Sequence, residues 1–419
     1  MKIFYNIFIA VYPFIAKIIS TKNTKAKLWL TGRKNIFTKL KEAFANNKSE
    51  VIWMHCSSLG EFEQGRPVLE KIKQTYPSYT ILLTFFSPSG YEIQKNYAYA
   101  NWVYYLPLDS AKNATQFLDI VQPKLTLFIK YEFWYYYLTE IKKRNIPLLL
   151  LSASFRKNQP FFKWYGKIYR EMLQCFSYFF VQDNNCADLL HKIGFTKNVS
   201  IAGDTRFDRV IEIANSFESI EIIEKFIGTD KVIVAGSTWT DDDEALDHYA
   251  NTNTHIKFII APHQIETERI NECLKLYKNA VLFSVLVNEP NSNFTEKNVL
   301  IIDNIGMLSK LYKYATICFV GGAFGDDGVH NVLEAAVYKK PVVFGPEFEK
   351  YIEAKELVEN NGGISIENAL ELEQVFNKLL TDNLFYETTA INAENYVQNN
   401  SGATKIIVDF IYAKRLLTN

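Results

Sequence analysis

The chain has 419 residues, of which 48% are apolar and 22% charged, and this is the composition of a folded protein. Its 46 basic and 46 acidic residues give a net charge of zero, which argues against a nucleic-acid partner. The five cysteines contain no CxxC pair and the six histidines no HExxH motif, so we expect neither disulfides nor a bound metal. The length exceeds one ordinary core and predicts two domains.

The first segment of the chain is apolar. Residues 3–19 (IFYNIFIAVYPFIAKII) carry one charge, Lys17, and are slightly short for a spanning helix of about 20 residues. Several Lys and Arg residues follow, with no acidic residue before Glu42, a pattern that predicts a cytoplasmic location for the rest of the chain. We interpret residues 1–20 as a membrane anchor that spans the bilayer or lies in its interface. A buried core helix is the alternative.

The first half of the chain alternates between short apolar runs and helical patterns. This alternation predicts a doubly wound parallel sheet of the Rossmann type. The predicted strands cover residues 51–54, 80–86, 102–106, 124–129, 147–152, 178–181 and 200–202.

The pattern restarts after a charged helical stretch at residues 208–230, which predicts a second Rossmann-like domain. We therefore expect an α/β fold with an acceptor-binding domain at 21–210 and a donor domain at 211–419, whose last helix packs back on the first domain. In open parallel sheets, ligands bind beyond the carboxyl ends of the strands, so two such domains are expected to face a cleft. The predicted strands cover 231–235, 257–261, 280–283, 299–302, 315–320 and, as the last, 341–344.

The loop HCSSLGE (55–61) directly follows the first predicted strand. Gly60 permits a tight turn, and Glu61 falls at a helix N-terminus, where a carboxylate can accept a proton from a substrate hydroxyl. The helix dipole is expected to lower the pKa of Glu61 and keep it ionised. A purely helix-capping glutamate is the alternative.

Three other stretches of the first half carry candidate residues. After the fourth strand, Glu132 and Trp134 are expected to face the cleft, although the surrounding aromatic residues also suit a core. Residues 156–170 (RKNQPFFKWYGKIYR) predict a helix with Lys163 and Lys167 on one face, suited to an anionic membrane or a phosphorylated lipid. A solvated face over an ordinary core is the alternative. Arg206 can supply a cation for a phosphate or a carboxylate.

The second half contains a glycine-rich stretch, GGAFGDDGVHNVLEAA, which begins at Gly321 directly after a predicted strand. Gly322 continues a turn that residues without a Cβ enter freely. A helix is predicted to start near His330 or Asn331, and its N-terminus would offer an anion site for a phosphate. His330 and Glu334 are four residues apart and would share a helix face. The alternative is an ordinary turn with a solvated acidic loop.

Three further loops of the second half end near predicted strands. Ser237, in a loop expected to open a helix, can bind an anion through its backbone N–H and its hydroxyl. His263 can contact a nucleobase or a phosphate, and Gly306 allows close backbone approach. The acidic run at 241–244 is interpreted as a solvated first helical turn rather than a metal site.

Taken in order, these stretches resemble the Kdo transferases of lipopolysaccharide synthesis. These are inverting glycosyltransferases of the GT-B type that move 3-deoxy-D-manno-octulosonic acid (Kdo) from CMP-Kdo to the lipid A precursor. The resemblance implies a protein at the cytoplasmic side of the cell inner membrane. The motifs that carry it are HCSSLGE (55–61), YEFW (131–134), GDTRFD (203–208), AGSTW (235–239), APH (261–263), GVHNVLEAA (328–336) and FGP (344–346).

The resemblance implies roles for matching residues. Glu61 would be the catalytic base, and Arg206 keeps the charge of a family lysine and would stabilise the departing phosphate. We expect the donor, CMP-Kdo, on Ser237, Pro262, His263, Gly306, Gly321, Gly322, His330, Asn331 and Glu334. We expect the acceptor, a phosphorylated glycolipid, on Ser58, Gly60, Glu132, Trp134, Lys163 and Lys167.

The chain departs from the family pattern at three positions that concern the donor. Pro262 stands where the family usually has Arg, Ala323 where it has Ser, and Met307 where it has Glu. Two other functions therefore stay open. One is another GT-B transferase that uses a UDP-sugar, and the other is a catalytically inactive, membrane-tethered protein that binds a sugar nucleotide.

Overall fold

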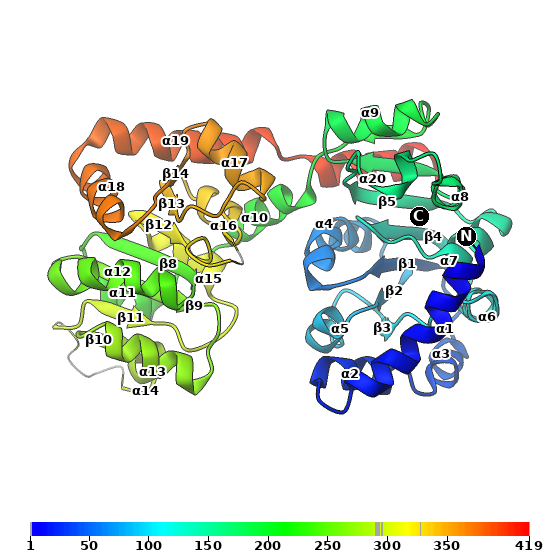
Figure 1. The fold of residues 1–419 in the computed structure, drawn as a ribbon, viewed down its shortest axis with the longest axis horizontal. Helices are drawn as coiled ribbons and strands as arrows, with labels where there is room; N and C mark the ends of the chain where they lie inside the picture. The colour runs from blue at the N-terminus through cyan, green and yellow to red at the C-terminus, as the bar shows by residue number, and fades with distance from the viewer. Residues whose placement is uncertain (1, 290–293, 295, 327, 419) are drawn as a thin grey trace. The chain divides into compact units, whose positions relative to one another are not determined.

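The computed structural model describes residues 2–289, 294, 296–326 and 328–418, so Asp327 of the glycine-rich stretch lies outside the described residues. The chain forms two compact units (Figure 1). Unit 1 combines Met1–Arg209 with Ser401–Asn419, and unit 2 is Val210–Asn400. Each unit contains a seven-stranded parallel sheet with helices, which confirms the prediction of two Rossmann-like α/β halves.

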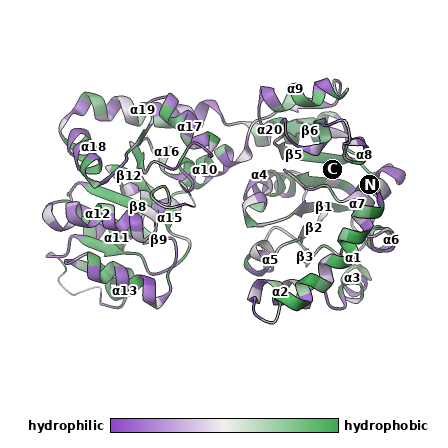
Figure 2. Cartoon of the chain, viewed as in Figure 1, coloured by the Kyte–Doolittle hydropathy of each residue, from purple (hydrophilic) through white to green (hydrophobic). Residues whose placement is uncertain are grey.

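The sheet of unit 1 has the order β3-β2-β1-β4-β5-β6-β7. Its strands are nearly continuous apolar runs because helices cover both faces (Figure 2). The direction of the strand order reverses between β1 and β4, and such a reversal is where open α/β sheets bind ligands. The strands are β1 (Val51–Cys56), β2 (Thr80–Phe85), β3 (Trp102–Tyr105), β4 (Pro123–Ile129), β5 (Leu148–Ala153), β6 (Tyr178–Val181) and β7 (Val199–Ile201).

Two hydrophobic clusters hold the helices of unit 1 against its sheet. The cluster on one face includes residues of α4 and the C-terminal α20, and the cluster on the other includes residues of α3, α6, α7 and α9. The Asp208 carboxylate accepts hydrogen bonds from the Gly402 and Thr404 N–H groups, at 2.6 and 2.7 Å, and so fixes the start of α20 in unit 1. The helices are α1 (Lys2–Ile19), α2 (Thr24–Gly32), α3 (Ile36–Phe44), α4 (Leu59–Thr75), α5 (Pro88–Gln94), α6 (Ala111–Val121), α7 (Tyr135–Lys143), η1 (Pro160–Phe162), α8 (Lys167–Leu173), α9 (Asn184–Lys192), α20 (Ala403–Ala413) and the start of α10 (Thr205–Asn215), which continues into unit 2.

The helix predicted over residues 156–170 is wrong. The chain forms the short η1, becomes extended at Lys163 (ψ 155°), and starts α8 only at Lys167. Gly166 is tightly enclosed, because a Cβ there would collide with the Pro160 carbonyl oxygen. Lys163 and Lys167 therefore share no helix face, and Trp164 between them is 91% exposed.

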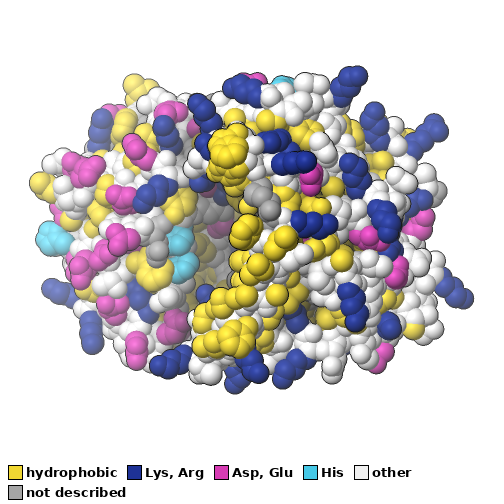
Figure 3. Space-filling view, turned by 45° about the vertical axis from the view of Figure 1, so that its right-hand side comes forward, with side chains coloured by type: hydrophobic (Ala, Val, Ile, Leu, Met, Phe, Trp, Pro, Cys, Tyr) yellow, Lys and Arg dark blue, Asp and Glu magenta, His cyan; other side chains and the backbone are white. Residues whose placement is uncertain are grey.

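The N-terminal helix α1 rests on unit 1 by one face only. The Tyr5 hydroxyl donates to the Asp109 carboxylate and accepts from the Tyr135 N–H at 3.2 Å. The Tyr12 ring packs edge-on against Trp29, with centroids 5.0 Å apart. The other face of α1 is an exposed apolar strip with Lys and Arg side chains nearby (Figure 3), so α1 is no buried core helix. The strip consists of Ile3, Phe4, Ile7, Phe8, Val11, Phe14, Ile15, Ile18 and Ile19.

The sheet of unit 2 has the order β10-β11-β9-β8-β12-β13-β14, and its order reverses between β8 and β12. The prediction that 341–344 is the last strand is wrong, because the edge strand β14 follows. It contains only Gly363, Ile364 and Ser365 and has no apolar run to reveal it. The strands are β8 (Val232–Thr238), β9 (Lys257–Pro262), β10 (Ala280–Leu282), β11 (Val299–Ile301), β12 (Ile317–Val320), β13 (Val342–Phe344) and β14 (Gly363–Ser365).

Residues of α12, α13 and α18 pack with the strands in one hydrophobic cluster of unit 2. The charged stretch 208–230 forms the end of α10 and the separate α11. The helices of unit 2 are α11 (Glu221–Ile227), α12 (Thr240–Thr252), α13 (Thr267–Leu276), α14 (Phe283–Asn288), α15 (Leu308–Leu311), η2 (Tyr312–Tyr314), α16 (Leu333–Ala336), α17 (Ile352–Glu359), α18 (Ala369–Thr381) and α19 (Asn383–Asn399).

Candidate active site

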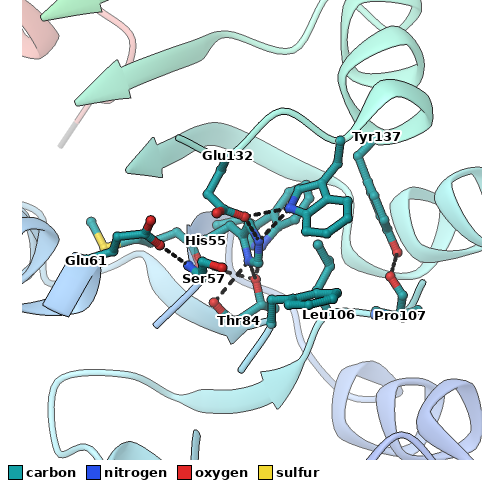
Figure 4. A network of polar contacts seen from close by, with 12 residues as sticks. His55, Ser57, Glu61, Thr84, Leu106, Pro107, Glu132 and Tyr137 are labelled. Carbon is teal, nitrogen blue, oxygen red and sulfur yellow. Dashed lines mark hydrogen bonds and ion pairs between the residues drawn. The ribbon is translucent and has the colours of Figure 1, made fainter. Parts of the chain in front are cut away.

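The strand reversal of unit 1 brings two candidate carboxylates to one edge of its sheet. β1 and β4 are parallel neighbours, so the loops that follow Cys56 and Ile129 leave the sheet on the same side. The first loop leads into α4 with Glu61, and the second carries Glu132 and Trp134. Figure 4 shows Glu61 and Glu132 near the end of β1, with His55 and Ser57 drawn with them.

Glu61 lies in the first turn of α4, where its carboxylate accepts a hydrogen bond from the Ser57 N–H. Ser58 is the N-cap residue of this helix, with φ −138° and ψ 176°, but its side chain makes no capping hydrogen bond. Glu61, at the third helical position, therefore reaches back to the N–H of the residue before the N-cap, a contact similar to half of a capping box. The capping interpretation and the catalytic one thus concern the same carboxylate and do not exclude each other.

The environment raises the pKa of Glu61 to about 8, mainly because the carboxylate is buried and also because the Glu132 charge is near. The Ser57 and Ser58 N–H groups and the Lys130 charge act in the opposite direction. The expectation that the helix dipole lowers this pKa is therefore wrong, since desolvation outweighs it. A base with a pKa close to working pH is well matched to proton abstraction, because it is both strong and partly ionised.

Glu132 is held in a buried hydrogen-bond network. Its Oε2 lies 2.7 Å from Nε2 of His55 and accepts from the Trp134 indole N–H at 2.5 Å. Nδ1 of His55 lies 3.1 Å from the Thr84 carbonyl oxygen and 2.9 Å from the Thr84 hydroxyl. His55 is fully buried and Glu132 is 4% exposed. Glu132 therefore has an internal partner, and its acceptor-binding role stays a prediction.

His55 is the residue that the sequence reasoning missed. It lies inside an otherwise apolar strand, β1, and a buried histidine there requires polar partners from elsewhere in the chain. Those partners are 29 and 77 residues away, at Thr84 and Glu132. The available signal was a histidine directly after the predicted strand 51–54, at the start of the predicted loop that contains Glu61; the strand in fact extends through His55 to Cys56.

The other predicted residues of unit 1 have varied surroundings. Gly60 lies inside α4 with open space where a Cβ would be, so the tight turn expected there does not exist. Arg206 donates from Nε at 2.9 Å and Nη2 at 2.8 Å to the Asp204 carboxylate. Gln64 and Gln182 bind the same carboxylate at 3.1 and 3.0 Å. The charge of Arg206 is therefore balanced by a buried acid.

The strand reversal of unit 2 brings the end of β8 beside the glycine-rich stretch after β12. Asp242, in the first turn of α12, joins the two segments through Oδ2, which accepts from the Trp239 N–H at 2.8 Å and from the Gly322 N–H at 2.7 Å. Asp242 is fully buried, as is its neighbour Asp243, which pairs with Arg269. The prediction of a solvated acidic turn is therefore wrong for these two residues.

Gly322 occupies a position that requires glycine. Its φ is +95°, and a Cβ there would collide with the Gly328 carbonyl oxygen and lie 2.7 Å from the His330 ring. The helix predicted to start near His330 is wrong, because α16 begins only at Leu333 and has four residues. His330 lies instead in the loop, where its N–H donates to the Gly321 carbonyl at 3.1 Å.

Three rings beside this loop form a stack. His263 stacks on Trp239 with centroids 4.8 Å apart and on His330 at 4.4 Å. The Trp239 indole N–H donates to His330 Nε2 at 3.1 Å. His263 is exposed, so the stack presents a planar edge to solvent, which suits a nucleobase.

The remaining donor candidates lie at loops of unit 2. Ser237 does not open a helix as predicted but lies in β8 at a bulge, with φ +56°. Pro262 is the buried last residue of β9 and has no N–H to offer a phosphate. Gly306 is exposed, with φ +95°. Asn331 donates to Glu334 at 2.9 Å, so these two side chains act as one polar group.

Similarity to known proteins supports a glycosyltransferase. The model of the family described as 3-deoxy-D-manno-octulosonic-acid transferase (kdotransferase) matches residues 33–209. The 3-deoxy-D-manno-octulosonic acid transferase of Haemophilus influenzae is 28% identical over 86% of both chains. A bifunctional glycosyltransferase/methyltransferase of Fusobacterium nucleatum is 29% identical over 87% of this chain, which spans only 59% of that protein. The UDP-GlcNAc 2-epimerase of Neisseria meningitidis shares the fold, with a TM-score of 0.62 and 16% identity over 87% of this chain and all of that one.

Two parallel seven-stranded sheets form a GT-B-like fold, which glycosyltransferases share with the epimerase named above, and the sequence relatives indicate that this chain is a glycosyltransferase. Within the class, the chain is similar along most of its length to the Kdo transferases, whose family model matches residues 33–209.

Proposed function

We propose that this enzyme transfers Kdo from CMP-Kdo to the lipid A precursor (lipid IVA) with inversion at the anomeric carbon. The observation that carries the proposal is Glu61, a half-buried carboxylate with a raised pKa at the strand reversal of unit 1, in a chain similar to the Kdo transferases. Such a group can deprotonate a sugar hydroxyl without a covalent intermediate. A single displacement inverts the configuration of the transferred sugar.

The proposed reaction is a single displacement at the anomeric carbon of Kdo. Glu61 removes the proton of an acceptor hydroxyl, and the hydroxyl oxygen forms a bond to the anomeric carbon of Kdo. The bond between that carbon and the phosphate oxygen breaks, and CMP departs with the electron pair. In unit 2, backbone N–H groups near Gly321 and Ser237 would stabilise the departing phosphate. The edge of the Trp239–His263–His330 stack would hold the cytosine.

Unit 1 has features that support a lipid acceptor. A groove of about 260 Å³ lies between α1, α2 and the segment after β2. It ends at Ser87, whose N–H donates at 2.7 Å to the carbonyl of Ser57, in the loop that leads to Glu61. An acyl chain in this groove would place a lipid headgroup near the proposed base. The lining includes apolar side chains such as Ile15, Ile19 and Trp29, with Lys25 available for an anionic headgroup.

Turnover with the two proposed substrates tests the function. We expect the purified chain to release CMP from CMP-Kdo only when a phosphorylated, acylated acceptor is present, and to use the deacylated acceptor less well. The measurement is the mass of the glycolipid product together with the configuration of its new linkage by NMR. Inhibition by UDP but not by CMP would favour a UDP-sugar transferase. Binding of CMP without any turnover would favour an inactive binding protein.

We further propose that the exposed strip of α1 docks unit 1 on the cytoplasmic face of the inner membrane. By length and composition α1 is also sufficient to cross a bilayer, but its Tyr5 and Tyr12 face is occupied by the rest of unit 1. A helix with one apolar face exposed and lysines beside it suits the membrane interface. Trp164, on the loop between η1 and α8, adds a second exposed aromatic.

A charge placed in the α1 strip should release the protein from membranes. We expect Phe14→Glu to lower the fraction that sediments with vesicles containing anionic lipid several-fold, because Phe14 is 65% exposed within the strip. The matched control is Leu384→Glu, which charges a 79% exposed leucine in α19 of unit 2. Equal binding of Phe14→Glu and the unmodified protein, or an equal loss in Leu384→Glu, would contradict the docking face.

A further inference from the structure

The buried pair of His55 and Glu132 has no part in the mechanism above, and its contacts define its protonation. The Thr84 hydroxyl lies 2.9 Å from Nδ1 of His55 and can donate to it, so we assign the ring proton of His55 to Nε2. Nε2 then donates to Oε2 of Glu132, 2.7 Å away. The Trp134 N–H donates to the same oxygen, at 2.5 Å. Two donors on one oxygen favour the ionised form of the Glu132 carboxylate.

The groups that face Glu61 come from three segments. The Glu132 charge, after β4, raises the pKa of Glu61, while the Lys130 charge, directly after β4, lowers it; the buried Cys56 thiol at the end of β1 also lies near Glu61. The Ser57 and Ser58 N–H groups, before α4, also stabilise the ionised carboxylate. Glu132 is the one whose negative charge acts most strongly on Glu61, after burial itself. The group that fixes Glu132 therefore also influences the base.

We propose that His55 is a positioning residue, which holds the Glu132 carboxylate ionised and fixed at the strand reversal of unit 1, so that this charge strengthens Glu61 as a base. The inference rests on the proposed role of Glu61 in Kdo transfer. His55 does not touch the substrate in this scheme. It acts through Glu132, to whose carboxylate Trp134 also donates.

The protonation of Glu61 can be followed directly, without any turnover. The measurement is a ¹³C NMR titration of glutamate carboxyl groups in the full chain, with the Glu61 signal assigned from Glu61→Gln. We expect a pKa near 8 in the unmodified protein and a fall to about 7 or below in Glu132→Gln and His55→Leu, because each removes the ionised carboxylate near Glu61. His55→Gln keeps an amide N–H for Glu132 and should leave the titration of Glu61 unchanged.

The same variants separate positioning from packing. If His55 only fills the core, its replacement would lower the melting temperature and leave the pKa of Glu61 unchanged. An unchanged Glu61 pKa in His55→Leu would therefore overturn the proposal. In Glu132→Gln, adding His55→Leu should cause no further shift. If His55→Leu does not fold, His55→Asn, too short to reach Glu132, replaces it. Failure of both to fold while His55→Gln folds would show a purely structural role and also overturn the proposal.

Kinetics provide the second measurement. Because only ionised Glu61 accepts a proton, kcat/KM for Kdo transfer should rise with pH to a plateau above about 8, and His55→Leu should move this rise to lower pH. At pH 6, kcat/KM as a fraction of its plateau value should be about tenfold higher in His55→Leu than in the unmodified enzyme, because a pKa lowered by one unit changes the ionised fraction tenfold. An enzyme without Kdo transfer would refute the proposed function, while the NMR titration would still decide the role of His55.

Discussion

Replacing Glu61 with Gln should lower kcat for Kdo transfer about 10²–10⁴-fold, the usual contribution of a general base. The amide oxygen of Gln can still accept from the Ser57 N–H, so the start of α4 and the fold should persist. Glu61 belongs to unit 1, whereas the proposed nucleotide site belongs to unit 2, so binding of CMP should be unchanged. Initial rates of Kdo transfer, CMP titration calorimetry and the melting temperature check the three parts.

Glu63→Gln is the matched control for this variant. Glu63 lies two residues after Glu61 in α4, and burial raises its pKa as well. Its oppositely charged neighbours are Arg66 and Arg209, and Glu132 is not among the main charges that act on it. We expect Glu63→Gln to change kcat less than about threefold, since Glu63 pairs with Arg66 and substitutions away from the site usually have small effects. A Glu61→Gln enzyme that transfers Kdo at the normal rate would reject Glu61 as the base. An equal loss in both variants would point to a structural effect of α4.

The sequence predicted the two sheets well because their strands are buried on both faces. Runs such as 51–54 and 148–151 are apolar without interruption, and a parallel sheet covered by helices on both faces makes that pattern favourable. The edge strand β14 was missed because an edge position demands little burial. The helix predicted at 156–170 does not form because Pro160 and Gly166 divide the segment. Proline and glycine interrupt a helix even where basic residues recur at helical spacing.

The sequence predicted those residues of the candidate site whose role depends on the loop that contains them. Glu61 at the start of a helix and Gly322 after a strand are local features, and the structure places both at strand reversals. His55 was not predictable in this way, because its partners come from distant segments. The same holds for Asp242, whose sequence neighbours suggested a solvated turn but whose carboxylate binds the Gly322 N–H, 80 residues away. Polar groups of this kind reveal themselves only when the fold supplies their partners.

The two units have sheets of the same kind, so each can hold one of the two proposed substrates. Each sheet reverses its strand order once, between β1 and β4 or between β8 and β12, and each reversal carries a buried acid that fixes a loop. In unit 1 that acid is Glu132, whose charge acts on Glu61, the carboxylate that we propose as the base. In unit 2 it is Asp242, which accepts from the Trp239 and Gly322 N–H groups and so fixes the turn that we propose as the phosphate site.

Replacing Gly322 with Ala should abolish most of the affinity for CMP. A residue with a Cβ at φ +95° pays roughly 1–2 kcal/mol in backbone strain, and this Cβ would also meet the Gly328 carbonyl and the His330 ring. The loop must therefore shift, which disturbs both the Gly322 hydrogen bond to Asp242 and the ring stack at His330. We expect the Kd for CMP, measured by calorimetry, to rise at least about tenfold, since tenfold corresponds to about 1.4 kcal/mol.

Gly325→Ala is the control for this second variant, because it adds the same methyl group to the same loop. Its Cβ would lie 3.6 Å from the Asp241 carboxylate, an ordinary van der Waals distance, and no positive φ opposes it. We expect Gly325→Ala to bind CMP within about twofold of the unmodified chain, because it introduces neither strain nor overlap. If Gly322→Ala binds CMP as tightly as Gly325→Ala does, the loop after β12 is not the phosphate site, and the nucleotide must bind elsewhere in unit 2.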